Sequence, residues 1–346
     1  MDLVKSKDFF ENNNNFELIK DIKSNCLYGD ESILNNVDLT ICIPTYKRDK
    51  TLKDAIDSAL NQKESNLKYC IIIVDNDDNI QNDSTRKLVE SYNNSKLLYY
   101  KNEKNIGMFN NWNRCFEIAK SKWIALLHDD DFLKEDYVSY LEQLLPLINK
   151  KKVSCLCFAF DRLYTDGRKQ ETVVAKANGI KKFYHIITRC FQNRKISRMD
   201  TYLAYLFGGN PFAIPSCGIL FDREKVITTG GFDEKIYPTA DFSYVLYLMH
   251  MKSVYFCHHA VGIYRWEYNE SLKPEIYIKS VEHQRYETLF LGKKHKILNS
   301  LFNKELMHEK DLLLEHKAFK PSKMLILLRR FLMDTKLYSD SVNIYK

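Results

Sequence analysis

The strongest constraint on the fold is an alternation of short apolar segments with segments of helical periodicity, which begins at Val37. Four apolar segments are rich in β-branched and aromatic residues and end in polar ones: VDLTICIPTY, YCIIIVD, KLLYYKN and WIALLHDDD. Three segments with apolar residues at helical spacing lie between them: TLKDAIDSALNQ, STRKLVESY and MFNNWNRCFEIAK. Strands and helices that alternate at this spacing predict an α/β protein with a mostly parallel sheet flanked by helices.

Polar residues follow each of the four predicted strands. They are Thr45 to Arg48, Asp75 to Asp78, Lys101 to Gly107 and Asp129 to Asp131. Ligands of such sheets bind outside the carboxyl ends of the strands, where the loops converge. A single acidic loop is more often a solvated turn, but four polar loops in phase at one edge predict a binding site.

The acidic loop indicates metal-dependent chemistry on phosphate. Its three adjacent carboxylates offer the oxygen ligands that Mn²⁺ and Mg²⁺ prefer, and such an ion bridges diphosphate oxygens. No GxxxxGK[ST] or GxGxxG motif follows the first strand, which disfavours a P-loop kinase and a dinucleotide enzyme. The formal net charge of +7 suits nucleotides, lipid diphosphates or anionic membrane surfaces without choosing among them. No nucleic-acid partner is predicted.

In their order and separations, the motifs ICIPTYKR, IIIVDNDD, KNIGMFNNWN and LLHDDDF resemble those of the family 2 glycosyltransferases. The resemblance runs from about Asp38 to Asp241. It implies a GT-A fold and an inverting enzyme that moves a sugar from a nucleotide diphosphate donor to an acceptor hydroxyl. The expected donor is a UDP-sugar, and the expected role is the assembly of a surface polysaccharide or another glycan, with a free or lipid-linked acceptor.

Two alternatives stay open. A sugar-phosphate nucleotidyltransferase would use a similar sheet and metal, but it usually has a Gly-rich opening that PTYKR lacks. A catalytically silent nucleotide-sugar-binding protein could have the same fold, although the intact acids Asp130 and Asp241 argue against it.

The resemblance also implies roles for individual residues. Asp130 would hold the metal, Asp129 would face the ribose or the donor sugar, and Asp131 would support the loop or the donor sugar. Asp75 would contact the base. The remaining positions implied to line the nucleotide-sugar pocket are Pro44, Thr45, Tyr46, Arg48 and Asn105, and Gly107 and Asn113 also fit the family pattern.

Two positions depart from that pattern. His128 stands where many members carry another aspartate, and Trp112 stands where many carry arginine. The departures weaken the inference about ribose recognition and about the contacts to the donor sugar.

The segment TGGFDEKIYPTADFSYVLYLM supplies the predicted base. Gly230 and Gly231 allow a tight turn close to the substrate, and Asp241 opens an apolar run of helical character. The segment resembles the family motif in which an aspartate removes the proton from the attacking hydroxyl, which implies that Asp241 is the general base. A helix N-cap is the alternative interpretation of Asp241.

Further along, CHHAVGIYRWEYNES resembles the end of the catalytic domain, and Glu267 stands where several relatives have histidine. His258 and His259 could approach the metal, but packing or surface roles are favoured. Nine cysteines without zinc spacing predict reduced thiols, with Cys155 and Cys157 buried in a strand.

The predicted organisation has three parts. Residues 1–37 form an N-terminal extension or cap, and residues 271–346 form a helical C-terminal region. Residues 38–270 form the catalytic domain, with a nucleotide-sugar half at 38–132 and an acceptor half at 133–270.

The location is predicted to be cytoplasmic. No apolar stretch approaches the roughly 18 residues of a spanning helix, and the N-terminus lacks the pattern of a signal peptide. The basic stretch between Thr165 and Asp200 is a solvated face or a contact for a lipid diphosphate. The basic amphipathic segment 321–334 can lie at the inner face of a membrane, or it can pack on the catalytic domain or on a sister subunit.

Overall fold

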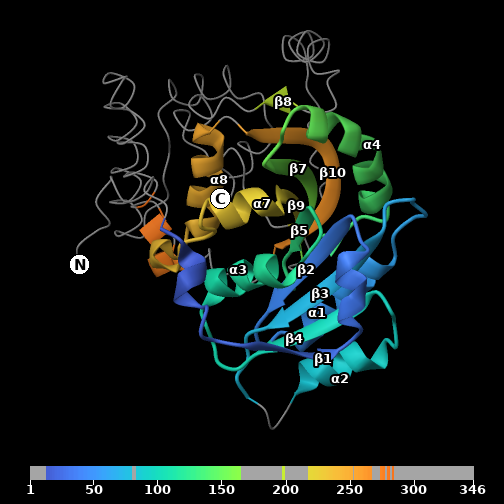
Figure 1. Ribbon diagram of the computed structural model, residues 1–346, viewed down its shortest axis with the longest axis vertical. Helices are drawn as coiled ribbons and strands as arrows, with labels where there is room; N and C mark the ends of the chain where they lie inside the picture. The colour runs from blue at the N-terminus through green and yellow to red at the C-terminus, as the bar shows by residue number, and fades with distance from the viewer. Residues whose placement is uncertain are drawn as a thin grey trace.

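The computed structural model describes residues 13–79, 83–164, 197–198, 217–251, 253–266, 273–276, 279–280 and 283. Within this part of the chain a ten-stranded sheet forms the centre of the molecule (Figure 1). The strand order is β1-β4-β3-β2-β5-β9-β7-β10-β6, and β8 pairs with β10 outside this path.

The strands are β1 (Ser24–Tyr28), β2 (Leu39–Thr45), β3 (Tyr69–Asp75), β4 (Leu97–Asn102), β5 (Trp123–Leu127), β6 (Phe132–Leu133), β7 (Cys155–Tyr164), β8 (Ser197–Arg198), β9 (Cys217–Asp222) and β10 (Val254–Trp266). The α-helices are α1 (Asp49–Leu60), α2 (Ser84–Ser91), α3 (Met108–Ile118), α4 (Tyr137–Lys150), α7 (Arg223–Thr228) and α8 (Ala240–His250). The 3-10 helices are η1 (Asn15–Leu18), η2 (Glu31–Asn35) and η3 (Glu234–Ile236).

The first half of the sheet confirms the predicted strands and helices. Strands β4, β3, β2 and β5 are neighbours in that order, and each pair is parallel. The second half differs, because β9 runs antiparallel to both β5 and β7. The sheet as a whole is therefore mixed: the predicted strands β4, β3, β2 and β5 are parallel, and β7 and β10 form a second parallel pair beyond β9.

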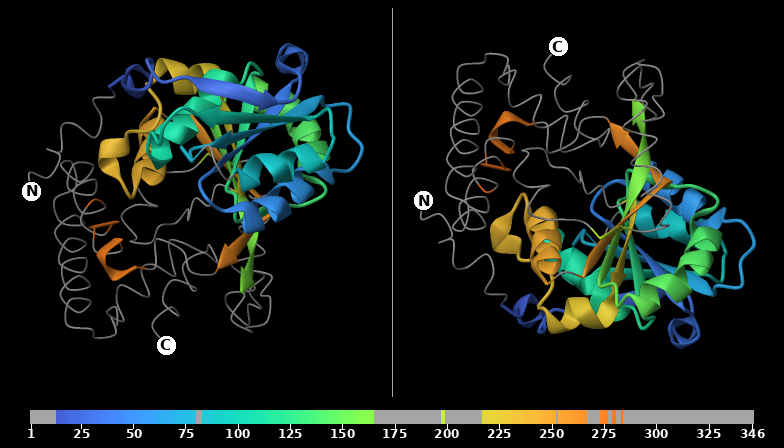
Figure 2. Two further views of the ribbon diagram at one scale, coloured as in Figure 1. Left: turned by 90° about the horizontal axis from the view of Figure 1, so that it is seen from below. Right: turned by 90° about the horizontal axis from the view of Figure 1, so that it is seen from above.

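Helices cover both faces of the sheet (Figure 2). Ile41 and Ile43 of β2 belong to a buried cluster with residues of α1, α2 and α4, whereas Cys42 belongs to a cluster with residues of α3, α7 and α8. This two-residue alternation follows from the geometry of a strand, whose successive side chains point to opposite faces. Because all of these side chains are apolar, both faces need a helical cover.

The described part of the predicted N-terminal extension belongs to the sheet. Strand β1 pairs antiparallel with β4 and forms one edge. Before it, the backbone carbonyls of Ile19 and Ile22 accept hydrogen bonds of 2.7 and 2.6 Å from the guanidinium of Arg114 on α3. Residues 13–37 thus cover an edge that would otherwise expose unpaired backbone groups; the boundary near residue 38 remains a prediction.

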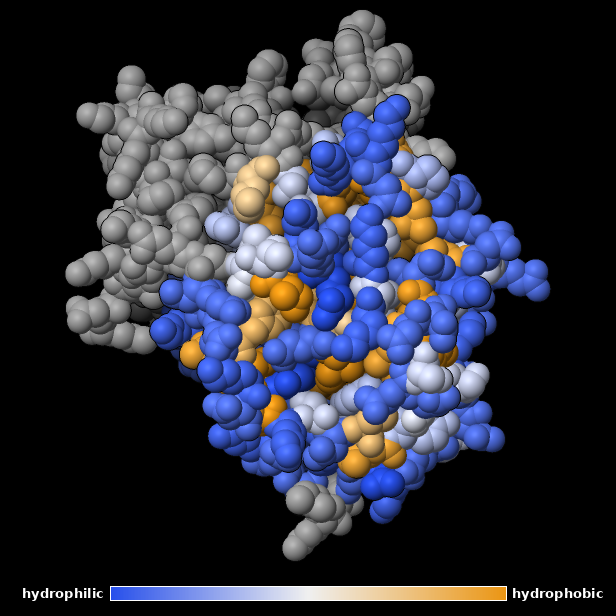
Figure 3. Space-filling view, viewed as in Figure 1, coloured by the Kyte–Doolittle hydropathy of each residue, from blue (hydrophilic) through white to orange (hydrophobic). Residues whose placement is uncertain are grey.

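The regions predicted to meet an acceptor or a membrane lie mostly outside the described residues. Of the basic stretch before Asp200 the structure describes residues 197–198, and the segment 321–334 is outside it altogether. Among the described residues, the helices are too short or too polar to cross a bilayer. The face shown in Figure 3 carries its hydrophobic residues in separate patches among hydrophilic ones.

Candidate active site

The loop after β5 meets the loop after β2 at the carboxyl edge of the sheet. The hydroxyl of Thr45 donates a 2.7 Å hydrogen bond to Asp129. Arg48 lies 2.6 Å from a carboxylate oxygen of Asp130 and 3.4 Å from one of Asp129. The structure therefore brings together these four residues, which the sequence predicts at one site.

Asp131 is fully buried behind this loop. Its carboxylate accepts hydrogen bonds from the thiol of Cys217 on β9 (2.9 Å) and from the backbone N–H of Arg265 on β10 (3.0 Å). Burial, reinforced by the neighbouring charge of Asp130, raises the pKa of Asp131 to about 8. Burial also raises the pKa of Asp129 to about 6, against the opposing effect of Arg48. The loop thus places three carboxyl groups close together, and burial disfavours the charged form of two of them.

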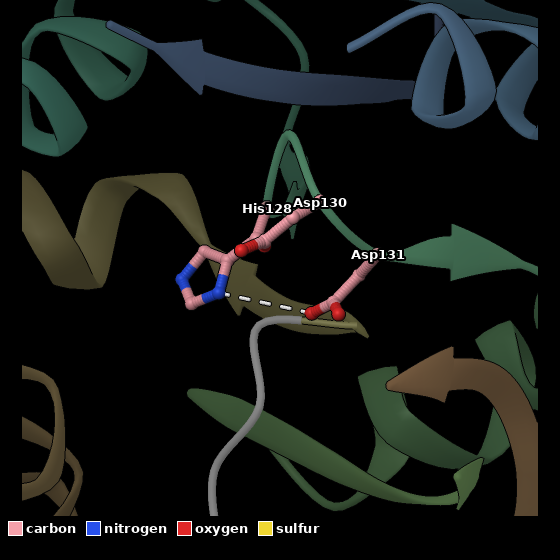
Figure 4. Close-up of side chains that lie close together, drawn as sticks. All are labelled: His128, Asp130 and Asp131. Carbon is pink, nitrogen blue, oxygen red and sulfur yellow. Dashed lines mark ion pairs between the residues drawn. The ribbon is translucent and has the colours of Figure 1, made fainter. Parts of the chain in front are cut away.

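A possible metal site is formed by His128, Asp130 and Asp131, which point toward one another from this loop (Figure 4). One ligand atom from each of them lies within 4.8 Å of the others, and the imidazole Nδ1 is 3.7 Å from a carboxylate oxygen of Asp131. Among the described residues Asp131 has no ion pair with a lysine or arginine. Two carboxylates and an imidazole with a deficit of positive charge fit a divalent cation.

Asp75, predicted to contact the base, lies at the same edge but faces the protein. Its side chain is 1% exposed, and it accepts hydrogen bonds from the Tyr99 hydroxyl (2.8 Å) and the Asp77 backbone N–H (2.9 Å). Lys101 lies 3.6 Å from Asp75 and 3.2 Å from Asp83. Burial raises the pKa of Asp75, and the hydrogen bonds and Lys101 oppose that change. Its carboxylate is thus engaged by the protein itself.

Asn76 joins the loops after β3 and β4. Its side-chain amide donates to Asn105 (2.8 Å) and to the Gly107 carbonyl (3.1 Å), and it accepts from Asn102 (3.0 Å) and from the Ile106 N–H (2.9 Å). Asn105, predicted to line the pocket, is exposed and is oriented by Asn76. This contact was not predicted, although Asn76 lies inside the IIIVDNDD motif.

Two further pocket residues have contrasting positions. Pro44 is buried within β2, so its side chain belongs to the core. Tyr46 follows the strand and is 43% exposed, which makes it an exposed aromatic ring directly beside the Thr45 and Arg48 contacts.

Asp241 lies in the first turn of α8, as predicted, and is half-buried. Burial raises the pKa of its carboxyl to about 6, whereas hydrogen bonds from backbone N–H groups lower it. The preceding turn contains Gly230 and Gly231 at φ +85° and +71°, a backbone conformation that favours glycine. Asn113 of α3 holds this turn, because its side chain donates to the Phe232 carbonyl and accepts from the Phe232 N–H, both at 2.8 Å.

One buried cluster connects the His128 loop to the helix that carries Asp241. The His128 ring lies 5.0 Å from Trp112, and Trp112 lies 5.3 Å from Phe232. Trp112 and Phe232 share their cluster with Ala240 and Phe242, which flank Asp241. Ala240 and Phe242 therefore pack on the face of the sheet that α3 covers.

Glu234 connects η3 to the start of α3, which follows the carboxyl end of β4. Glu234 accepts hydrogen bonds from the backbone N–H groups of Phe109 (2.7 Å) and Asn110 (3.1 Å), at the start of α3. Gly107 precedes them at φ +89°, and a Cβ there would lie 2.7 Å from the Glu234 carboxyl carbon. The backbone angle thus favours glycine at this position, and a larger residue would also displace the Glu234 carboxylate from the start of α3.

The histidines of β10 show a different arrangement. His259 is hydrogen-bonded to Asp136 at 2.8 Å, away from the acidic loop's own contacts. The side chain of His258 and the residue Glu267 lie outside the described part of the structure. The roles of Cys217 and Arg265 were not predicted, because their contacts with Asp131 join residues that are far apart in the chain.

Comparison with solved structures defines the class of fold. The chain is similar to residues 1–349 of S. aureus TarS in complex with UDP, with a TM-score of 0.50, 14% identity, and coverage of 79% of this chain and 70% of that chain. It is also similar to the mannosyltransferase PcManGT from Pyrobaculum calidifontis, with a TM-score of 0.50, 13% identity, and coverage of 98% and 91%. The fold is that of the GT-A glycosyltransferases.

The chain itself belongs to glycosyl transferase family 2, whose family model matches residues 40–222, more than half of the chain. A stretch of 126 residues is 27% identical to the abequosyltransferase RfbV of Salmonella typhimurium. That stretch covers 34% of this chain and 37% of RfbV, so the chain matches well under two thirds of that relative. The family expected from the motifs is confirmed.

Proposed function

We propose that the protein is an inverting, metal-dependent glycosyltransferase that moves a sugar from a UDP-sugar to an acceptor hydroxyl in the assembly of a surface polysaccharide or another glycan. The observation that carries the proposal is the group of His128, Asp130 and Asp131 beside Arg48 at the carboxyl edge of the sheet. Support also comes from the similar structures, since TarS was determined with UDP and PcManGT with GDP-Man and Mn²⁺.

The donor half of the site would bind the nucleotide with the residues after β2. Tyr46 offers an exposed ring on which a base can stack, and Arg48 offers a guanidinium for diphosphate oxygens. Mn²⁺ or Mg²⁺, held by Asp130, would stabilise the negative charge on the departing diphosphate. Asp129 would orient Arg48 through the ion pair between them.

The acceptor half would supply the base. Asp241 would remove the proton from the acceptor hydroxyl as that oxygen attacks the anomeric carbon from the side opposite the diphosphate. A pKa of about 6 suits this role, because the carboxylate is ionised at neutral pH and still takes up a proton more readily than an ordinary aspartate. The direct displacement inverts the configuration at the anomeric carbon.

A panel of nucleotide diphosphates and their sugars tests the proposal. We expect UDP with Mn²⁺ to raise the melting temperature of the full chain more than GDP, dTDP or UDP alone. Slow release of UDP from one UDP-sugar should accompany that binding. Absence of stabilisation by every nucleotide would refute the proposal, and binding without hydrolysis or transfer would favour a catalytically silent protein.

The location of the reaction is a separate proposal. We expect the enzyme to act at the cytosolic face of a membrane, through the segment 321–334 and a lipid-linked acceptor. Full-length protein and a chain ending at Lys320 can be compared by sedimentation with anionic vesicles. Equal sedimentation of the two would refute the membrane role of this segment.

A further inference from the structure

His128 differs from its acidic neighbours because it brings nitrogen to a site of oxygen ligands. Its Nδ1 faces a carboxylate oxygen of Asp131 at 3.7 Å (Figure 4), which is too long for a direct hydrogen bond. Two ligands on one ion, each about 2.1 Å from it, lie about 3.0 Å apart when adjacent and about 4.2 Å apart when opposite. The 3.7 Å between the imidazole Nδ1 and the Asp131 oxygen falls between these two distances.

Other residues hold both the imidazole of His128 and the carboxylate of Asp131 in position. The imidazole packs against Trp112 with ring centroids 5.0 Å apart, and Trp112 is itself buried. Asp131 is fixed by the Cys217 thiol and by the backbone N–H of Arg265. The imidazole Nε2 is buried, and it has no hydrogen-bond partner among the described residues, so no described hydrogen bond draws the ring away from the acids. Such support keeps ligands in place before the ion arrives.

The contact between His128 and Trp112 fixes the imidazole within the fold. Trp112 lies on α3 and is buried against Phe232. The indole and imidazole rings are tilted by 46° to each other, and this packing restricts the orientation of the imidazole.

We infer that His128 ligates the metal ion through an imidazole nitrogen, together with Asp130 and Asp131, and that this nitrogen makes the site prefer Mn²⁺ over Mg²⁺. The inference rests on the proposed function and specifies its metal. Mg²⁺ is bound mainly by oxygen and keeps its water reluctantly, whereas first-row transition metals accept imidazole readily. Arg48, which lies against Asp130, would move toward the diphosphate when the ion binds.

Pulsed EPR of the full-length protein with Mn²⁺ and UDP tests the ligation directly. We expect a ¹⁴N coupling from a bound imidazole that is lost in His128→Asp and kept in His259→Ala, a control whose histidine is bound to Asp136. Persistence of the coupling in His128→Asp, or its absence from the unaltered protein, would overturn the inference. Circular dichroism and melting temperature verify that each variant is folded.

Competition between the two ions gives a second readout. The preference for Mn²⁺ over Mg²⁺ should fall about tenfold in His128→Asp, because the replacement restores an oxygen ligand without removing the site. An unchanged preference would contradict the inference even if transfer activity changed. If the unaltered protein binds no Mn²⁺ with UDP, the metal dependence in the proposed function fails as well; if Asp130→Asn abolishes binding but His128→Asp changes neither readout, only the present inference fails.

Discussion

Two groups of acidic residues at the same edge of the sheet have opposite surroundings. Around Asp75 the protein supplies the hydroxyl of Tyr99, a backbone N–H and the ammonium of Lys101, and the side chain is 1% exposed. Around Asp130 the side chain is 24% exposed, and its described cation is Arg48, which Asp129 shares. We refer to these as the Asp75 cluster (Asp75, Asp83, Tyr99 and Lys101) and the Asp130 cluster (Arg48, His128, Asp129, Asp130 and Asp131).

The difference shows how similar residues at similar places can have different functions. The Asp75 cluster already contains its cation and its donors, so it stabilises the loop after β3 and the start of α2. The Asp130 cluster contains three carboxyl groups, and burial raises the pKa of Asp131 to about 8. Carboxyl groups that share a single arginine among the described residues are suited to bind a cation from solution.

Removal of the charge of Asp130 should have the largest effect. We expect Asp130→Asn to lower the rate of sugar transfer by about four orders of magnitude, because the loss of an ion that stabilises the departing diphosphate costs several kcal/mol. Steady-state transfer assays with a Mn²⁺ titration measure it. If Asp130→Asn transfers sugar at the normal rate, the functional distinction between the Asp130 cluster and the Asp75 cluster is wrong.

Asp241 provides a third acid for the comparison. Asp241→Asn should reduce transfer by about a thousandfold, because the acceptor loses its general base. In the unaltered protein the rate should fall about tenfold per pH unit below a pKa of about 6, since the protonated carboxyl cannot accept a proton. This limb should be missing from the pH profile of the variant.

The stability of the same variant gives an independent measurement. The folded pKa of Asp241 is above its ordinary value of 3.8, so the folded state binds more protons than the unfolded state between that value and about 6. The free energy of unfolding therefore falls as the pH rises through this interval. Asp241→Asn should remove this cost and melt at a higher temperature than the unaltered protein at pH 8, but not at pH 4. A lower melting temperature at pH 8 would instead assign Asp241 to helix capping.

The Asp75 cluster should respond in stability and not in metal binding. Lys101→Met leaves the buried Asp75 and the half-buried Asp83 without their ammonium group, which should lower the free energy of unfolding by about 3 kcal/mol. The loss should be larger at pH 8 than at pH 5, because burial raises the pKa of Asp75 and its carboxyl is less ionised at the lower pH. Lys53→Met is the matched control, since it removes an exposed ion pair with Asp57 that contributes little to stability.

Urea unfolding measures the two lysine variants, and Mn²⁺ titration of the folded proteins completes the test. Unchanged Mn²⁺ affinity in Lys101→Met would sharpen the distinction between the clusters. A parallel loss of affinity and stability would show that they act as one unit.

The smallest expected effect concerns Cys217, which donates to Asp131 from another strand. Cys217→Ala should weaken Mn²⁺ binding by about tenfold, because it removes a group that orients a ligand. Cys217→Ser retains a donor and should bind Mn²⁺ nearly normally. Equal binding by all three proteins, measured by isothermal titration, would remove Cys217 from the site.

The sequence predicts the parallel half of the sheet well, because its strands are continuous apolar runs such as Tyr69–Asp75, with the polar residues placed after them. The order of those residues around the edge follows from parallel pairing, which explains why Thr45 and Arg48 meet Asp129 and Asp130. The antiparallel insertion of β9 has no such local signal, so the support of Asp131 by Cys217 was not predicted.

Individual contacts were harder to predict than the site. A motif assigns Asp75 to the edge of the sheet but cannot show that Tyr99 and Lys101 already occupy its carboxylate. Likewise, Trp112 and His128 are separate features of the sequence, and only the structure shows that their rings pack against each other.

Strand β1 has a practical consequence for anyone who wishes to isolate the catalytic unit. The family match begins at residue 40, so a protein cut at that boundary would lack β1 and would leave the backbone of β4 unpaired along the edge of the sheet. Such an edge pairs readily with its counterpart on another molecule. A fragment that begins near residue 13 should stay monodisperse on gel filtration under conditions in which one that begins at residue 40 aggregates.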